Sequence, residues 1–133
     1  MAADQEPLPE STLQDESEAY DLFQRGMELL TNRHPAQAAM VLTSALRLEP
    51  DKNSIREALA QAQFAMGRYQ HAADLFAAIA AAVPDSDYAH YCLGRCLRAL
   101  GRDGEARAHL RLARALNPNS SLYRDALASD DAR

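Results

Sequence analysis

The sequence predicts an all-α protein made of repeated helical hairpins, and three observations lead to this fold class. First, the 133 residues match themselves at a spacing of 34, in three frames that begin at Ala19, Asn53 and Asp87. Second, apolar residues recur at intervals of three and four within each half of a frame, which is typical of amphipathic helices. Third, every frame closes on a proline, and a proline ends a helix.

Each frame also contains a pair of small residues where the two helices of a hairpin would cross. The pairs are Gly26 with Ala38, Ala60 with Ala72, and Gly94 with Ala106. A larger side chain at such a position would hold the two backbones apart. Gly67 and Gly101 fall between the two halves of their frames, where the end of a helix favours a residue that accepts a positive φ.

With these features the chain resembles the tetratricopeptide repeat family, whose 34-residue motif reads W-x2-L-G-x2-Y, then A-x3-F, then P. The third frame agrees best, through Leu93, Gly94, Leu97, Ala106, Leu110, Ala113 and Pro118. The departures are Leu22, Arg56 or His90 in place of the leading aromatic residue, and the turn NRHP in the first frame. The resemblance implies an α-α superhelix of three helix-turn-helix repeats with a C-terminal capping helix.

The expected organisation follows from these frames. The repeats span residues 19–52, 53–86 and 87–120 of a domain that covers residues 17–128, and residues 121–128 form the helix that covers the last repeat. Residues 1–16 are expected to be a disordered tail, because they are acidic, contain proline and have few large apolar side chains. Residues 129–133 are expected to be a disordered C-terminus.

Composition narrows the function classes. The net charge of -5 is unevenly distributed, with six acids and no bases in residues 1–18, and six arginines against three acids in residues 87–118. The most apolar run, residues 75–83, is too short to cross a bilayer, and the first residues lack the basic and apolar regions of a signal peptide. We therefore expect a soluble cytoplasmic protein with no membrane partner. Thirteen arginines, one lysine and abundant alanine are typical of a GC-rich bacterial genome.

The segment CLGRCLRALGRDGEA, residues 92–106, invites a reading as a metal site, a redox site or a phosphate loop. No strand precedes it and no lysine follows it, so we interpret its glycines as packing and helix-end residues. Cys92 and Cys96 lie four apart, but zinc needs four ligands and the four histidines stand singly. The favoured interpretation is two packed cysteines and no cofactor or metal, with a reversible redox role left open.

Catalysis and nucleic-acid binding are also not expected. No serine lies in a GxSxG motif, and a helical solenoid offers no obvious pocket for a buried acid and base, so we predict that the protein is not an enzyme. Arg107, Arg111 and Arg114 share one side of a helix. Because the protein is acidic overall and no aromatic residues are interleaved with these arginines, a solvated outer face is favoured over a nucleic-acid site.

The resemblance implies that the first helices of successive repeats line a concave groove that holds a peptide segment of a partner protein. The implied groove residues are Tyr20, Phe23, Met27, Leu30, Ser54, Glu57, Gln61, Phe64, Tyr88, Tyr91, Arg95 and Arg98. Such a groove is apolar at one end and basic at the other, which suits a segment with apolar anchors followed by a carboxylate-bearing end. The predicted function is a non-catalytic adaptor.

Other readings of the groove remain open at this point. The acidic N-terminal tail, lying near Arg95 and Arg98, or a second copy of the chain in a homodimer would cover the same apolar residues. A secretion-type or assembly chaperone and a regulatory subunit of an enzyme are alternative functions. A clamp for the acidic tails of cytosolic chaperones is not expected. It uses Lys, Asn, Asn, Lys and Arg, and the matching residues here are Phe23, Met27, Ala58, Tyr88 and Cys92.

Overall fold

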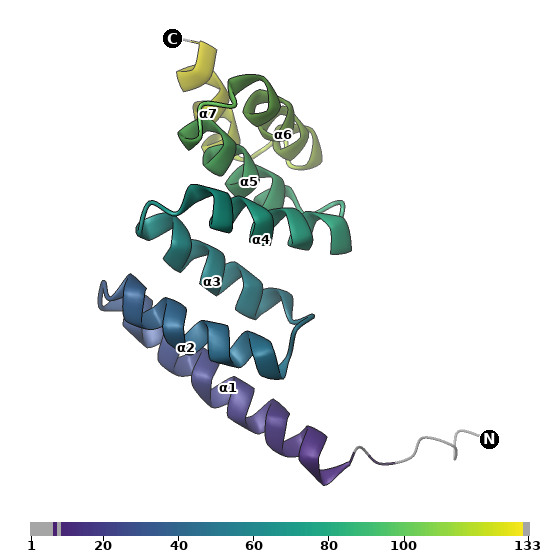
Figure 1. The fold of residues 1–133 in the computed structure, drawn as a ribbon. Helices are drawn as coiled ribbons and strands as arrows, with labels where there is room; N and C mark the ends of the chain where they lie inside the picture. The colour runs from purple at the N-terminus through teal and green to yellow at the C-terminus, as the bar shows by residue number, and fades with distance from the viewer. Residues whose placement is uncertain (1–6, 8, 132–133) are drawn as a thin grey trace, which may run out of the picture.

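The computed structural model describes residue 7 and residues 9–131, which form seven helices and no strand (Figure 1). The helices are α1 (Glu10–Thr31), α2 (Pro35–Leu48), α3 (Asn53–Ala65), α4 (Tyr69–Ala82), α5 (Asp87–Ala99), α6 (Asp103–Leu116) and α7 (Ser121–Asp131). Consecutive helices pack on one another along the whole molecule. The predicted all-α repeat fold is confirmed, and α3 and α5 begin at the first residues of the second and third frames.

The N-terminal helix is longer than the sequence analysis expected. Residues 10–16 were predicted to be disordered, yet they form the first turns of α1, which has 22 residues where α2 has 14 and α3 has 13. Residues 10–16 contain neither glycine nor proline, and the negative charge of Glu10 in the first turn interacts favourably with the positive end of the helix dipole. Local helix propensity therefore outweighs the acidic composition. The rest of the predicted tail, residues 1–6 and 8, lies outside the described residues.

The C-terminal helix also extends beyond its predicted end. α7 continues from residue 128 to Asp131, so residues 129–131 are helical where the sequence analysis expected a disordered C-terminus. The buried residues of α7 are Tyr123, Ala126 and Leu127, so the part of the helix that packs ends before the helix does. Residues 132–133 lie outside the part of the chain that the structure describes.

Two of the small residues identified in the repeat bring paired helices close together. A Cβ atom added to Gly94 would lie 2.9 Å from Leu110 Cγ and 3.2 Å from the carbonyl oxygen of Ala106, on the facing helix α6. In the first hairpin, a Cβ atom on Gly26 would collide with the Leu42 side chain. Each glycine therefore makes room for a leucine of the facing helix. The sequence spacing predicted only that it would lie against a small residue of that helix.

The first helix of each hairpin ends in the same backbone turn. Gly67 and Gly101 have φ angles of 75° and 79°, in the region that favours glycine. The backbone N–H of the next residue donates to a carbonyl in the last turn of the helix, 2.9 Å from Arg68 to Gln63 and 2.9 Å from Arg102 to Leu97. In the first hairpin Arg33 takes this place with a φ of 61°. The departure NRHP therefore keeps the turn.

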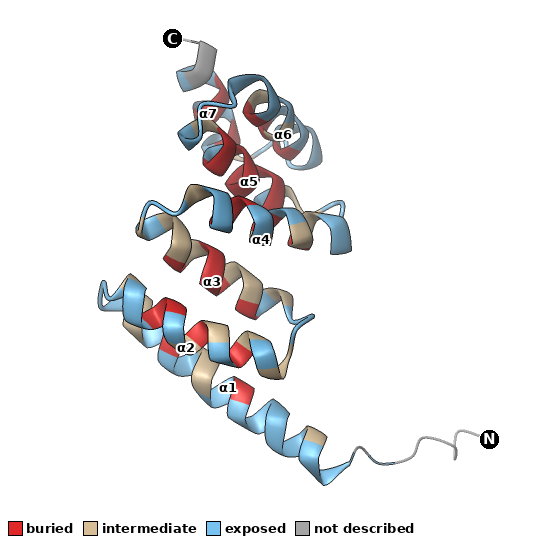
Figure 2. Cartoon of the chain, in the orientation of Figure 1, coloured by how far each residue is buried: buried red, intermediate tan, exposed pale blue. Residues whose placement is uncertain are grey.

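Burial is concentrated toward the C-terminal half (Figure 2). The buried residues of α5 run without a break from Ala89 to Gly94, because α4 and α6 pack on it and α7 also supplies core side chains. α1 buries only Ala19 and Gly26. Among the described residues, no helix combines the length and apolar character needed to span a membrane.

Candidate functional site

Several of the predicted groove residues line a hollow between α1 and the start of α3. Its volume is about 420 Å³, and its walls are Glu16, Ala19, Tyr20, Phe23, Glu49, Lys52, Ser54 and Ile55. Tyr20 has 61% of its surface exposed, although it is a large aromatic side chain. This end of the surface therefore exposes aromatic area at residues that the sequence analysis placed at the N-terminal end of the groove.

A second hollow lies between α3 and α5. Its volume is about 280 Å³, and it is lined by Gln61, Phe64, Ala65, Phe76, Tyr88, Cys92 and Arg95. The guanidinium carbon of Arg95 lies 4.6 Å from the ring centre of Phe64 and 5.7 Å from that of Tyr91. These stacking contacts hold a cation at the rim of an aromatic wall, so the hollow combines apolar surface with one positive charge.

Five of the predicted groove residues, namely Met27, Leu30, Glu57, Tyr91 and Arg98, line neither hollow. Two of them instead hold α7 against α5. Tyr91 is only 9% exposed and packs on Tyr123, with ring centres 5.2 Å apart. Arg98 donates to the carbonyl oxygen of Ala126 at 3.2 Å. Because α7 already occupies these side chains, Tyr91 and Arg98 are not free anchors for a partner.

The same end of the molecule is fixed by a polar cluster that the sequence analysis missed. Tyr123 donates its hydroxyl hydrogen to Asp87 Oδ2 at 2.7 Å, and Asn117 donates to the same oxygen at 3.3 Å. These hydrogen bonds lower the pKa of the Asp87 carboxyl below its ordinary value. The cluster joins α5, the α6–α7 connection and α7, so it holds α7 against the last repeat.

The two cysteines are packed inside the fold, as the favoured interpretation predicted. Cys92 is 5% exposed and Cys96 is fully buried. Burial raises the pKa of the Cys92 thiol to about 12 and that of Cys96 to about 11. Burial and the adjacent Cys92 also raise the pKa of Tyr88 to about 12. These groups are therefore uncharged at neutral pH, and Cys92 contributes an apolar wall to the second hollow.

Two histidines that appeared single in the sequence lie side by side. Nδ1 of His90 on α5 is 3.2 Å from Nδ1 of His109 on α6, and the two rings are stacked. His90 Nε2 lies 2.8 Å from the carbonyl oxygen of Pro84, which can only accept, so Nε2 carries a proton. The donor in the contact between the two Nδ1 atoms depends on the tautomers of the rings. Burial, and then His90, lower the pKa of His109.

The histidine pair does not extend into a metal site. In the described part of the chain, no group of three or more histidine, cysteine, aspartate or glutamate residues lies close enough together to hold a metal ion. The two Nδ1 atoms of the pair contact each other, and His90 Nε2 contacts Pro84. Its contacts connect α5 with α6 and are those of a structural pair.

Comparison with known proteins identifies the family. Tetratricopeptide repeat models match residues 23–87 and residues 63–129, and the second match alone spans half of the chain. The chain therefore belongs to the tetratricopeptide repeat family, as the 34-residue spacing indicated. A search of the curated proteins found no significant match.

Solved structures share the fold at low sequence identity. The first tetratricopeptide domain of Spaghetti (RPAP3) bound to the HSP90 peptide SRMEEVD has a TM-score of 0.82 at 18% identity, over 88% of this chain and 93% of that one. The Arabidopsis OM64 domain has a TM-score of 0.83 at 18% identity, over 89% and 98% of the two chains. MamA from Desulfovibrio magneticus RS-1 has a TM-score of 0.84 at 21% identity, over 90% and 67%.

Proposed function

We propose that the chain is a non-catalytic adaptor that binds a peptide segment of a partner protein along the surface shared by α1, α3 and α5. The observation that carries the proposal is the pair of hollows on this surface, one aromatic and one with a cation beside aromatic rings. Tetratricopeptide domains are protein-interaction modules, and one similar structure holds a peptide of HSP90. The positions that the resemblance assigns to a clamp for acidic chaperone tails carry other side chains in this chain, so we propose a different peptide.

The chemistry of the hollows describes the proposed peptide. Tyr20 and Phe23 present aromatic surface at the first hollow, and Tyr88 is 40% exposed beside the second. Arg95 is exposed and makes ring contacts, but no ion pair with a carboxylate in the described part of the chain. A segment with an apolar anchor followed by a carboxylate would bury the aromatic surface and pair with Arg95.

The test compares proteins captured from a lysate of the source organism by the wild type and by Tyr20→Ala/Tyr88→Ala/Arg95→Glu. The three side chains are exposed, so the variant is expected to fold, whereas Tyr91→Ala would remove a contact that holds α7. A matched control, Met40→Ala/Leu112→Ala/Arg47→Glu, changes exposed residues of similar kinds on the second helices α2 and α6. We expect a protein retained by the wild type and the control and lost by the triple variant.

Calorimetric titration of a synthetic peptide from the captured protein then measures the affinity directly. The triple variant is expected to weaken it about a hundredfold, because it removes two aromatic anchors and reverses one charge. Equal retention of the same proteins by all three baits would contradict binding at this surface. The peptide SRMEEVD serves as a specificity control and is expected not to bind, because the positions that would clamp it carry Phe23, Met27, Ala58, Tyr88 and Cys92.

The partner's behaviour would separate the adaptor from two related functions. A chaperone for secretion or assembly would keep an apolar segment of its client soluble on co-expression, and would release it later. A regulatory subunit would co-purify with its enzyme in constant stoichiometry. The buried, unpaired thiols fit action in a reducing compartment such as the cytoplasm.

A further inference from the structure

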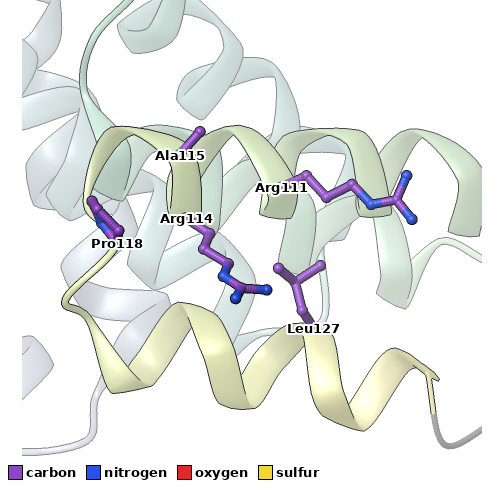
Figure 3. Close-up of a pocket in the computed structure, with 5 residues that line it drawn as sticks. All are labelled: Arg111, Arg114, Ala115, Pro118 and Leu127. Carbon is purple, nitrogen blue, oxygen red and sulfur yellow. The ribbon is translucent and has the colours of Figure 1, made fainter.

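A hollow outside the proposed peptide surface lies between α6 and α7. Its volume is about 460 Å³, and its walls are Arg111, Arg114, Ala115, Pro118 and Leu127. Figure 3 shows Arg114 reaching from α6 toward α7, and Leu127 rising from α7 toward α6 between the two arginines. The hollow therefore places two guanidinium groups around a small apolar floor.

The two arginines of this hollow have no carboxylate partner within the described part of the chain. The ion pairs there join Arg56 to Asp51 and Arg102 to Glu105. Arg111 and Arg114 are both exposed and stand one helical turn apart, an arrangement that can bind carboxylates on both sides of an apolar group. The hollow is suited to an acidic segment that carries an apolar side chain.

The start of α1 has this chemistry. Residues 10–18 contain Glu10, Asp15, Glu16 and Glu18 and no basic residue, and Leu13 is 50% exposed. Glu10 and Glu16 lie three residues before and after Leu13, so all three face roughly one side of the helix. In Figure 1 these turns project beyond α2, and all their side chains except that of Thr12 are exposed. A helical segment so little supported by packing gains stability from a partner.

The two features lie at opposite ends of the molecule (Figure 1), so one copy cannot bring them together. We propose that the hollow between α6 and α7 binds the first turns of α1 of a second copy, with Leu13 on Leu127 and with Glu10 and Glu16 beside the arginines. Each contact leaves one free hollow and one free α1, so copies associate head to tail in an open series. The proposal does not depend on peptide binding at α1, α3 and α5.

Sedimentation velocity of the purified full chain tests the proposal. In low salt the mean sedimentation coefficient is expected to rise with protein concentration as dimers and longer series form, and to return to the monomer value at about 0.5 M NaCl, where surface charges are screened. Arg111→Glu/Arg114→Glu and, separately, Glu10→Arg/Glu16→Arg are each expected to weaken association about tenfold or more, since each places like charges across the contact.

Charge exchange makes the test specific. A mixture of the two double variants restores opposite charges at every contact, and a single chain with all four substitutions does the same, so both are expected to associate again. The control Arg47→Glu/Arg68→Glu changes the net charge by the same amount as Arg111→Glu/Arg114→Glu, at exposed residues away from α6 and α7, and is expected to associate like the wild type. All of these substitutions lie on the surface, so circular dichroism should show an unchanged fold.

Two results would overturn the proposal. One is a wild-type chain that stays monomeric at low salt over the whole concentration range, which would assign the arginines to an acidic segment of another protein. The other is association that survives Arg111→Glu/Arg114→Glu or is not restored by charge exchange, which would place the contact elsewhere. Glu16 also lines the first hollow of the peptide surface, so Arg111→Glu/Arg114→Glu, which leaves that surface intact, is the variant that separates self-association from peptide binding.

Discussion

Arg33 occupies a backbone conformation that glycine occupies in the other two hairpins. Its φ of 61° is unfavourable for a residue with a Cβ atom, while its backbone N–H donates to Leu30 at 3.1 Å as the turn requires. The turn after α1 is therefore strained where those after α3 and α5 are relaxed. The strain is local, because Arg33 is exposed and makes no side-chain hydrogen bond in the described structure.

Arg33→Gly is expected to raise the free energy of unfolding by about 1 kcal/mol. Glycine removes the cost of the left-handed conformation, and the greater conformational entropy that it gives the unfolded chain offsets part of this gain. Urea unfolding followed by circular dichroism measures the change. Arg33→Ala is the control, because it shortens the side chain and keeps the Cβ atom, so it should give little gain. Equal gains from both substitutions would mean that the side chain, and not the backbone, is unfavourable.

The partly buried His109 makes the free energy of unfolding depend on pH. Burial, and then the neighbouring His90, lower the pKa of His109 in the folded protein below its ordinary value of 6.5. Below pH 6.5 the unfolded chain therefore binds a proton at His109 more readily than the folded protein does. Stability from this group is complete above that value and declines as the pH falls below it. Glu105 opposes the shift without reversing it.

His109→Asn removes the titrating group and keeps a side-chain donor near His90. The wild type is expected to lose stability more steeply than this variant as the pH falls from about 7 to 5.5, which thermal melts at each pH would measure. Parallel curves for the two proteins would show that His109 does not titrate differently in the folded and unfolded chains.

At the scale of the elements, the approach of α5 to α6 depends on Gly94. Its missing Cβ atom makes room for Leu110 and for the backbone of Ala106, and backbone has little freedom to move aside. Gly104, in the first turn of α6, is different, because a Cβ atom there would meet nothing within 4 Å. Gly104 therefore serves as a control for Gly94, because packing requires a glycine at position 94 and leaves open space at position 104.

Gly94→Leu is therefore expected to lower the free energy of unfolding by about 3 kcal/mol, toward the upper end of overpacking costs. Gly104→Ala should raise it by about 0.5 kcal/mol through helix propensity. Urea midpoints of the two variants measure both effects. An unchanged midpoint for Gly94→Leu would contradict the close crossing of α5 and α6.

At the scale of the whole molecule, the sequence predicted the features that recur in every repeat and missed contacts that occur only once. The 34-residue spacing located the hairpins, their close crossings and the turns at Gly67 and Gly101. The resemblance assigned Tyr91 and Arg98 to a partner, because it predicted a helix over the last repeat without showing which groove side chains that helix contacts. Acidic composition likewise suggested disorder where residues 10–16 have ample helix propensity.

The other features that the sequence did not predict depend on how each helix is rotated about its own axis. His90 and His109 meet because α5 and α6 turn those sides toward each other, and the hollow beside Arg111 depends on how α7 docks on α6. Neither is fixed by a repeat period. Charge asymmetry between the ends was visible in the sequence, but its significance required knowing that the acidic turns project and that Arg111 and Arg114 have no partner in the described structure.

The burial of both native thiols makes the chain convenient for spectroscopy. With Cys92 and Cys96 inside the fold and protonated at neutral pH, a maleimide dye would react slowly with the wild type and rapidly with a cysteine added at the surface. No native residue has to be removed first. A dye at position 17 on one copy and another at position 124 on a second would report by energy transfer whether the two ends meet.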